Sequence, residues 1–141
     1  MRTLGIDYGD SRCGFAITDA LNITVQGLET LETNGNDKLI LKKIDEYCTT
    51  YEIDTIVVGM PFMLSGDKSE RAIKTEKFIH KLKCKYNKLK IEWIDERLTT
   101  VAAHKTMNLL EINKHKKKNI VDTISAVYIL ETFLNKNKIS Y

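Results

Sequence analysis

The chain has 141 residues, 43% of them apolar and 29% charged, with 22 Lys and Arg against 19 Asp and Glu. This composition excludes wholesale disorder, and the length predicts one domain, residues 1–141. No run approaches the roughly 20 apolar residues of a membrane-spanning helix, so we expect a protein that does not enter a membrane. Neither a secretory signal nor a CxxC pair is visible. We therefore expect a cytoplasmic protein whose thiols are reduced.

The first part of the chain predicts three strands. Residues 3–8 form a short apolar run that ends in an acid, and Gly9-Asp10-Ser11 follows as a tight turn. Residues 12–18 predict a second strand, paired with the first as a hairpin. The β-branched residues 23–25 predict a third strand.

The rest of the chain alternates between helices and strands. Helical spacing predicts helices over residues 37–51, 69–85, 99–110 and 120–134, the third of them capped by Thr99 or Thr100. Apolar runs predict strands at 55–59, which Pro61 stops, and at 91–95. The order predicts an α/β fold with a mixed five-stranded sheet, in which three antiparallel strands precede two strands reached by helical crossovers, with helices on both faces.

Four carboxylates stand out by their positions in this pattern. Asp7 ends the first strand, Asp95 and Glu96 end the last, and Asp122 lies in the predicted first turn of the final helix. Ligands of such sheets gather at the carboxyl ends of the strands, where acids from two neighbouring strands would meet and the helix could add Asp122. Alone, each acid is explained as a strand-end or helix-cap residue, and the helix dipole favours Asp122.

Clustered carboxylates need a compensating cation, and hard oxygen ligands suit Mg²⁺ or Mn²⁺. Such a site favours phosphodiester hydrolysis, in which metal ions activate the attacking water and stabilise the leaving oxygen. The basic cluster Lys114-His115-Lys116-Lys117-Lys118 precedes Asp122, and we expect it to hold a nucleic-acid backbone against this edge of the sheet.

At these residues the sequence resembles the YqgF (RuvX) family, whose fold is RNase H-like and related to RuvC resolvase. The resemblance covers nearly the whole chain. The matching segments are Gly5-Ile6-Asp7-Tyr8-Gly9 with Arg12 and Gly14, Val58-Gly59-Met60-Pro61, Gly66 with Arg71-Ala72, Asp95-Glu96-Arg97-Leu98-Thr99-Thr100, and Lys118 with Val121-Asp122.

The resemblance implies a metal-dependent nuclease that trims the 5′ end of precursor 16S rRNA, with ribosomal particles as partners. It implies Asp7, Glu96 and Asp122 as catalytic metal ligands for Mg²⁺ or Mn²⁺, with Asp95 as the rival of Glu96. The residues that it implies for nucleic-acid contacts are Arg12, Arg97, Lys116, Lys117 and Lys118.

Three other functions are weighed against this interpretation. An older interpretation of the family is Holliday-junction resolution, for which a symmetric cut of branched DNA would favour a homodimer over a monomer. A non-catalytic RNA-binding module would keep the fold and the basic cluster. The segment Asp7-x-Gly9 also resembles the phosphate loop of actin-like ATPases, but these enzymes need a second copy of the domain, for which 141 residues leave no room.

Overall fold

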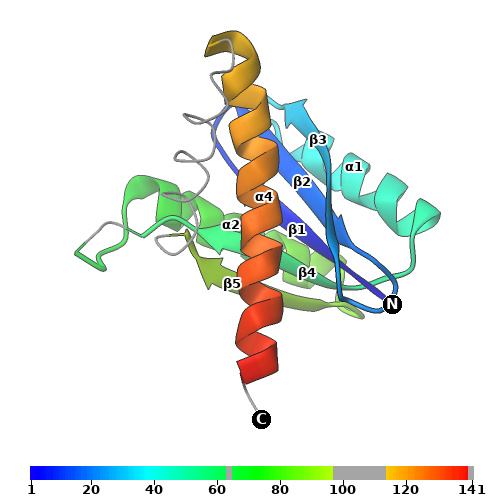
Figure 1. Cartoon of the computed structure of the whole chain (residues 1–141). Helices are drawn as coiled ribbons and strands as arrows, with labels where there is room; N and C mark the ends of the chain where they lie inside the picture. The colour runs from blue at the N-terminus through cyan, green and yellow to red at the C-terminus, as the bar shows by residue number, and fades with distance from the viewer. Residues whose placement is uncertain (63–64, 97–113, 140–141) are drawn as a thin grey trace.

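The computed structural model describes residues 1–62, 65–96 and 114–139, and within the last range the side chains of residues 123–136. These parts of the chain form a five-stranded sheet and three helices (Figure 1). In chain order the elements are β1 (Arg2–Tyr8), β2 (Arg12–Thr18), β3 (Val25–Glu32), α1 (Asp37–Thr50), β4 (Ile53–Met60), α2 (Glu70–Lys85), β5 (Lys90–Asp95) and α4 (Lys114–Ile139). The helix predicted over residues 99–110 lies outside the described residues.

The sheet has the strand order β3-β2-β1-β4-β5, with β1 in the centre. β1 pairs antiparallel with β2, and β2 antiparallel with β3, whereas β1, β4 and β5 run parallel. The predicted mixed sheet, with three antiparallel strands followed by two crossover strands, is therefore confirmed. Because β1, β4 and β5 share one direction, their carboxyl ends meet at the same edge of the sheet.

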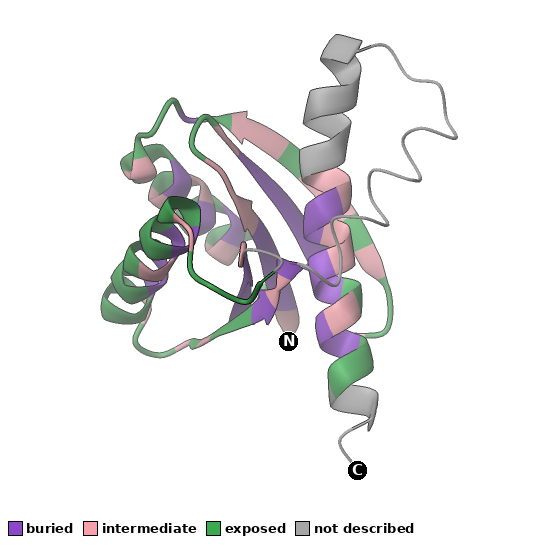
Figure 2. Ribbon diagram, turned by 90° about the vertical axis from the view of Figure 1, so that its left-hand side faces the viewer, coloured by how far each residue is buried: buried purple, intermediate pink, exposed green. Residues whose placement is uncertain are grey.

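Helices cover both faces of the sheet, as predicted. Figure 2 shows α4 on one face and the other two helices on the opposite face, with buried residues on the sides that meet the sheet. Successive residues of a strand alternate between the two layers. In β1, Leu4 and Ile6 belong to the core shared with α1 and α2, whereas Ala16 of β2 and Val57 of β4 belong to the core under α4.

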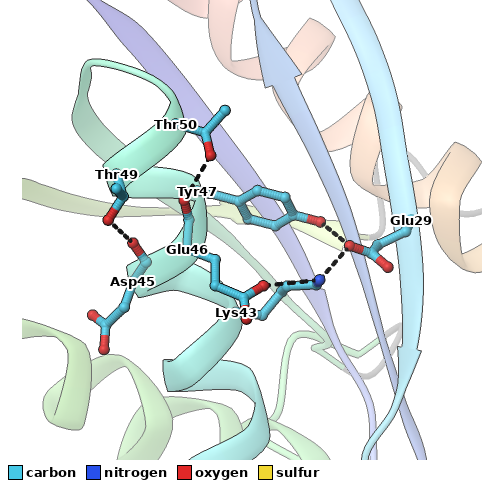
Figure 3. Close-up of polar contacts among 7 residues, drawn as sticks. All are labelled: Glu29, Lys43, Asp45, Glu46, Tyr47, Thr49 and Thr50. Carbon is cyan, nitrogen blue, oxygen red and sulfur yellow. Dashed lines mark hydrogen bonds and ion pairs between the residues drawn. The ribbon is translucent and has the colours of Figure 1, made fainter.

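Polar contacts attach α1 to the outer strand β3 (Figure 3). The Tyr47 hydroxyl donates a hydrogen bond to Glu29 at 2.7 Å, and the Lys43 ammonium lies 2.9 Å from the same carboxylate oxygen. These bonds lower the pKa of Glu29, and burial together with the Glu29 charge raises the pKa of Tyr47. Glu29 therefore stays ionised and fixes the helix against the sheet.

The predicted bounds of the third strand and of the last helix are wrong. β3 runs on to Glu32, past the predicted end at residue 25, and α4 runs on to Ile139, past residue 134. The third strand begins at Val25 and not at Ile23, because the Asp19 carboxylate accepts hydrogen bonds from the N–H groups of Ile23 at 2.7 Å and Thr24 at 3.1 Å and thereby holds both in the preceding turn. The last helix begins at Lys114 and not near Ile120. No proline or glycine separates the basic cluster from the apolar positions that follow, and lysine is a good helix former.

α4 lies directly against strand backbone at glycine positions. A Cβ on Gly27 of β3 would lie 2.7 Å from the Thr123 methyl group. One on Gly5 of β1 would lie 2.5 Å from Cγ of Leu130. Since carbon atoms in contact lie about 3.5–4.0 Å apart, any side chain at these two positions would push the helix away. The order of the two contacts, Thr123 with β3 and Leu130 with β1, shows that α4 passes from β3 toward β1 along its length.

None of the helices in the described ranges is long and apolar enough to cross a membrane. The three cysteines are free thiols, as expected from their spacing.

Candidate active site

The carboxyl end of β1 directs Asp7 into the α4 layer. Leu4 and Ile6 face the opposite core, so the alternation of the strand places Gly5 and Asp7 on the α4 side, where Gly5 contacts Leu130. The turn that follows needs a glycine, because a Cβ on Gly9 would lie 2.8 Å from the carbonyl oxygen of Arg12. That carbonyl accepts a hydrogen bond of 3.0 Å from the N–H of Gly9, which closes the hairpin beside the acid.

Glu96 reaches the same layer from the end of β5. Ile94 is buried in the core under α4, and Glu96, two residues later, is also buried, with 8% of its surface exposed. The expectation that the two acid-bearing strands are neighbours is wrong, because β4 lies between β1 and β5. β1 and β5 therefore lie two strand spacings apart, about 10 Å, and the side chains of Asp7 and Glu96 must meet across β4.

Gly59 of β4 makes this approach possible. A Cβ at Gly59 would lie 2.6 Å from Oε1 and 2.7 Å from Cγ of Glu96, and 2.6 Å from Cδ1 of Ile129. The Glu96 side chain consequently lies across the bare backbone of β4, beneath α4. Sequence reasoning did not assign Gly59 a role, although a glycine inside a buried strand is itself a signal of close approach.

The carboxyl groups of Asp7 and Glu96 share a hydrogen bond, which requires one of them to hold a proton. Burial raises the pKa of Asp7 well above its usual 3.8, and the charge and hydrogen bond of Glu96 raise it further. The guanidinium of Arg71, on the exposed side of the first turn of α2, acts in the opposite direction and lowers the pKa of Asp7. Arg71 is a second residue to which sequence reasoning gave no role at the site.

Asp95, the rival strand acid, lies elsewhere. It is partly buried and lines a cavity along the outer edge of β5 together with Trp93, which precedes it by two residues. The structure thus brings Glu96, and not Asp95, into hydrogen-bonding contact with Asp7. Strand alternation is the cause, since consecutive residues at a strand end point to opposite faces.

α4 crosses the sheet at the level of Asp7. Asp7 pairs in register with Gly14, and Gly14 with Thr30, whose hydroxyl lies 2.7 Å from that of Thr123. Asp122 directly precedes Thr123, but its side chain lies outside the described residues. It is the ninth residue of α4, so the expectation that it occupies the first turn, stabilised by the helix dipole, is wrong.

The residues predicted to contact nucleic acid are only partly described. Lys116, Lys117 and Lys118 form part of the first turns of α4 and do not precede the helix as expected, and their side chains lie outside the described residues, as does the whole of Arg97. Arg12 begins β2, at the same edge of the sheet as Asp7, where it pairs in register with Glu32 of β3.

The donor set at this edge fits a hard divalent cation. Within the described ranges no group of three or more His, Cys, Asp or Glu side chains converges, so the Asp7–Glu96 pair is the acidic centre that the structure provides. Two carboxyl groups in contact share a proton when no cation compensates their charge, and this proximity adds to the effect of burial on the pKa of Asp7. Carboxylate oxygens are the ligands that Mg²⁺ and Mn²⁺ prefer.

Holliday-junction resolvases are among the solved structures with the same fold. RuvC of T. thermophilus in complex with a junction substrate has a TM-score of 0.62 at 10% identity, with 99% of this chain and 97% of that chain covered. The fowlpox virus resolvase has a TM-score of 0.54 at 15% identity, over 96% of this chain and 99% of that chain. The fold is therefore that of the RNase H-like resolvases.

Sequence comparison narrows the class to one family. The family model RuvX, described as Holliday junction resolvase, matches residues 1–136. A protein of Ruminiclostridium cellulolyticum named "Putative pre-16S rRNA nuclease" is 47% identical over 136 residues, 96% of this chain and 95% of that protein. One of the same name from Acetivibrio thermocellus is 46% identical over 96% of both chains. The chain belongs to the RuvX family, as its motifs indicated.

Proposed function

We propose that the chain is a metal-dependent endonuclease, a single RNase H-like domain over residues 1–141 that acts in 5′-end maturation of precursor 16S rRNA. The contact between Asp7 and Glu96 carries this proposal, since it places two carboxyl groups where parallel strands of such sheets present ligands. The names of the relatives supply the RNA substrate. With that substrate the protein would work in the cytoplasm, on ribosomal particles.

Asp7 and Glu96, with Asp122 from α4, would hold Mg²⁺ or Mn²⁺. When bound, the cation lowers the pKa of a coordinated water and offsets charge on the phosphate. Asp7 and Glu96 must first lose the proton that they share, because only ionised carboxylates act as metal ligands. We therefore expect metal affinity and cleavage to rise with pH until Asp7 is ionised, because the pKa of Asp7 is raised.

The positive groups around the edge would hold the nucleic-acid backbone. Arg71 already acts on Asp7 electrostatically, and we propose that it contacts a phosphate beside the pair, with Arg12, Arg97 and the cluster Lys116, Lys117 and Lys118 extending the contact. Such contacts position the strand without reading its sequence.

The test is cleavage of a precursor 16S 5′-leader RNA in Mg²⁺, Mn²⁺ or EDTA. We expect Asp7→Asn and Glu96→Gln each to lower the cleavage rate about 1,000-fold, roughly 4 kcal/mol of transition-state stabilisation. Asp95→Asn is the matched control, one residue from Glu96, and should stay within a few-fold of wild type. Cleavage by the wild type in excess EDTA, or by Asp7→Asn at the wild-type rate, contradicts the proposal.

A second candidate is resolution of DNA junctions, which the description of the family model and the RuvC fold favour. A four-way junction assayed in parallel separates the two: cutting of the junction alone assigns the activity to recombination. Binding without cleavage of either substrate, unchanged in Asp7→Asn, would indicate a non-catalytic RNA-binding module.

A further inference from the structure

A groove follows the outer edge of β5 and begins next to the candidate active site. Two adjoining cavities form it, of about 350 and 800 Å³. Both are lined by Phe62, Lys83 and Trp93, and the larger one extends to Asp95, the neighbour of Glu96, and to Lys136 of α4. The groove is thus continuous with the strand end that carries the acid.

An aromatic pair forms the centre of this groove. Trp93 is a large apolar side chain with 48% of its surface exposed, although Ile91 on the same face of β5 packs against the core. The ring of Phe62 meets the indole edge-on, with centroids 5.5 Å apart and an interplanar angle of 73°. Phe62 therefore supports Trp93 from one side and leaves about half of the indole open to the groove.

Charged side chains of both signs flank the aromatic pair. Lys83 lines both cavities, and no carboxylate in the described part of the chain forms an ion pair with it. Lys68 lines the smaller cavity, where it pairs with Glu76, and Lys136 lines the larger together with the carboxylates Glu92 and Asp95. Lys83 is therefore the lysine best placed to contact a phosphate beside the aromatic pair. Aromatic faces that stack bases, set between cations that track the backbone, are the common features of proteins that bind single strands.

The position of Trp93 fits a strand that leaves the acidic pair. Trp93 precedes Glu96 by three residues, about 10 Å along an extended chain, and faces the other side of β5, so the nucleic-acid strand would pass around the end of β5 to reach it. This distance lies within reach of the first nucleotides beyond a phosphodiester held at Asp7 and Glu96. In a duplex those bases are already stacked on their neighbours, so the indole would find a free base face only on an unpaired strand.

Building on the proposed nuclease function, we propose that Trp93 stacks an unpaired base of single-stranded nucleic acid next to the cleavage site, and that Lys83 holds the adjoining phosphate. The groove along β5 then selects single strands over duplexes. It thereby deepens the proposed function by defining the form of substrate that the acidic pair receives.

The experiment uses Trp93 as its own probe, because it is the only tryptophan of the chain. The full-length protein is titrated in EDTA, which separates binding from cleavage, with a short single-stranded RNA and with the same sequence as a duplex. We expect the single strand to quench the tryptophan fluorescence and the duplex to leave it nearly unchanged. Absence of quenching at saturating single strand, or equal quenching by both, would overturn the proposal.

Variants test the contacts by anisotropy of a labelled single strand. Trp93→Ala should weaken binding about 10-fold or more and Trp93→Phe less, since stacking on a ring is retained. Lys83→Ala should weaken binding and reduce the slope of log K against log salt by about one. Lys77→Ala, an exposed residue of the same helix that lines neither cavity, is the matched control and should bind as wild type.

The two proposals fail separately. A wild type that cleaves RNA while Trp93→Ala binds single strands unchanged would refute the stacking site alone. Quenching by single strands without cleavage in any metal would refute the nuclease function and keep the stacking site. If the Trp93 fluorescence per molecule falls as the protein concentration is raised in the absence of nucleic acid, the groove is a contact between two copies of the chain, and the proposal is overturned.

Discussion

Gly59→Ala tests whether the acidic pair depends on the bare backbone of β4. The added Cβ would lie 2.6 Å from Oε1 of Glu96 and 2.6 Å from Cδ1 of Ile129. Since ordinary contact begins at about 3.5 Å, both side chains must retreat by roughly 1 Å. Glu96 is buried and already in contact with Asp7, so its retreat must separate the two carboxyl groups.

The expected losses follow from this displacement. Overpacking of a buried site costs about 1–3 kcal/mol, which for a chain of this length lowers the Tm by several degrees. A displacement of about 1 Å at a reacting centre costs on the order of 100-fold in rate. We therefore expect Gly59→Ala to remain folded at 25 °C and to cleave RNA about 100-fold more slowly than wild type.

The assay pairs thermal unfolding with metal-dependent cleavage in three variants. Ile129→Val removes the methyl group that the new Cβ would meet, so the double variant Gly59→Ala/Ile129→Val relieves the contact with α4 and leaves the contact with Glu96. We expect the double variant to recover stability relative to Gly59→Ala but not cleavage, and Ile129→Val alone to cleave normally. Cleavage by Gly59→Ala within threefold of wild type, or recovery of both properties together, would refute the reasoning.

Two further predictions concern the two faces of β1. The folded state binds the Asp7 proton more tightly than the unfolded chain, so the stability of the metal-free protein falls as the pH rises above 3.8 through the raised pKa. In EDTA, Asp7→Asn should therefore show a higher Tm than wild type at pH 7, by a margin that shrinks toward pH 3.8. Equal Tm values at pH 7 would contradict this. Tyr8→Phe keeps the stacking on Phe78, with ring centroids 4.3 Å apart, and loses the 2.7 Å hydrogen bond to Asp37. The free energy of unfolding in urea should therefore fall by about 1 kcal/mol, with the cleavage rate unchanged. A tenfold loss of cleavage would mean that Tyr8 contacts substrate.

The sheet could be predicted from sequence because its signals are local. The apolar run of β4 is stopped by Pro61, and the helices α1 and α2 have clear N-caps at Asn36 and Ser69. These helices are the crossover connections, and the crossovers make β1, β4 and β5 parallel. The start of β3 was missed because a side chain, Asp19, sets it through two backbone hydrogen bonds across the turn. The start of α4 was missed because a polar, basic turn carries no apolar periodicity.

The site was only half predictable, because it depends on strand order. Position alone identified Asp7 and the pair Asp95 and Glu96, but strand order decides whether two such acids can meet. With β4 between β1 and β5, the meeting depends on Gly59. Side chains alternate between the two faces of a strand, so the burial of Ile94 under α4 places Glu96, and not Asp95, on the α4 side. Arg71 comes from a crossover helix, and no strand pattern indicates its proximity to Asp7.

The arrangement couples the candidate active site to the integrity of the whole sheet. Asp7 and Gly59 lie in β1 and β4, Glu96 directly follows β5 at the same edge, and the space that Glu96 occupies is closed from above by Ile129 of α4. The acidic pair opposes this packing when both groups ionise, since the two carboxylates repel each other and Arg71 offsets only part of the effect on Asp7. A cation that binds only the folded state contributes RT ln(1 + [L]/Kd), about 2.7 kcal/mol at 100 times the Kd. The ion that the proposed reaction requires would therefore also offset the repulsion between the two carboxylates of its own site.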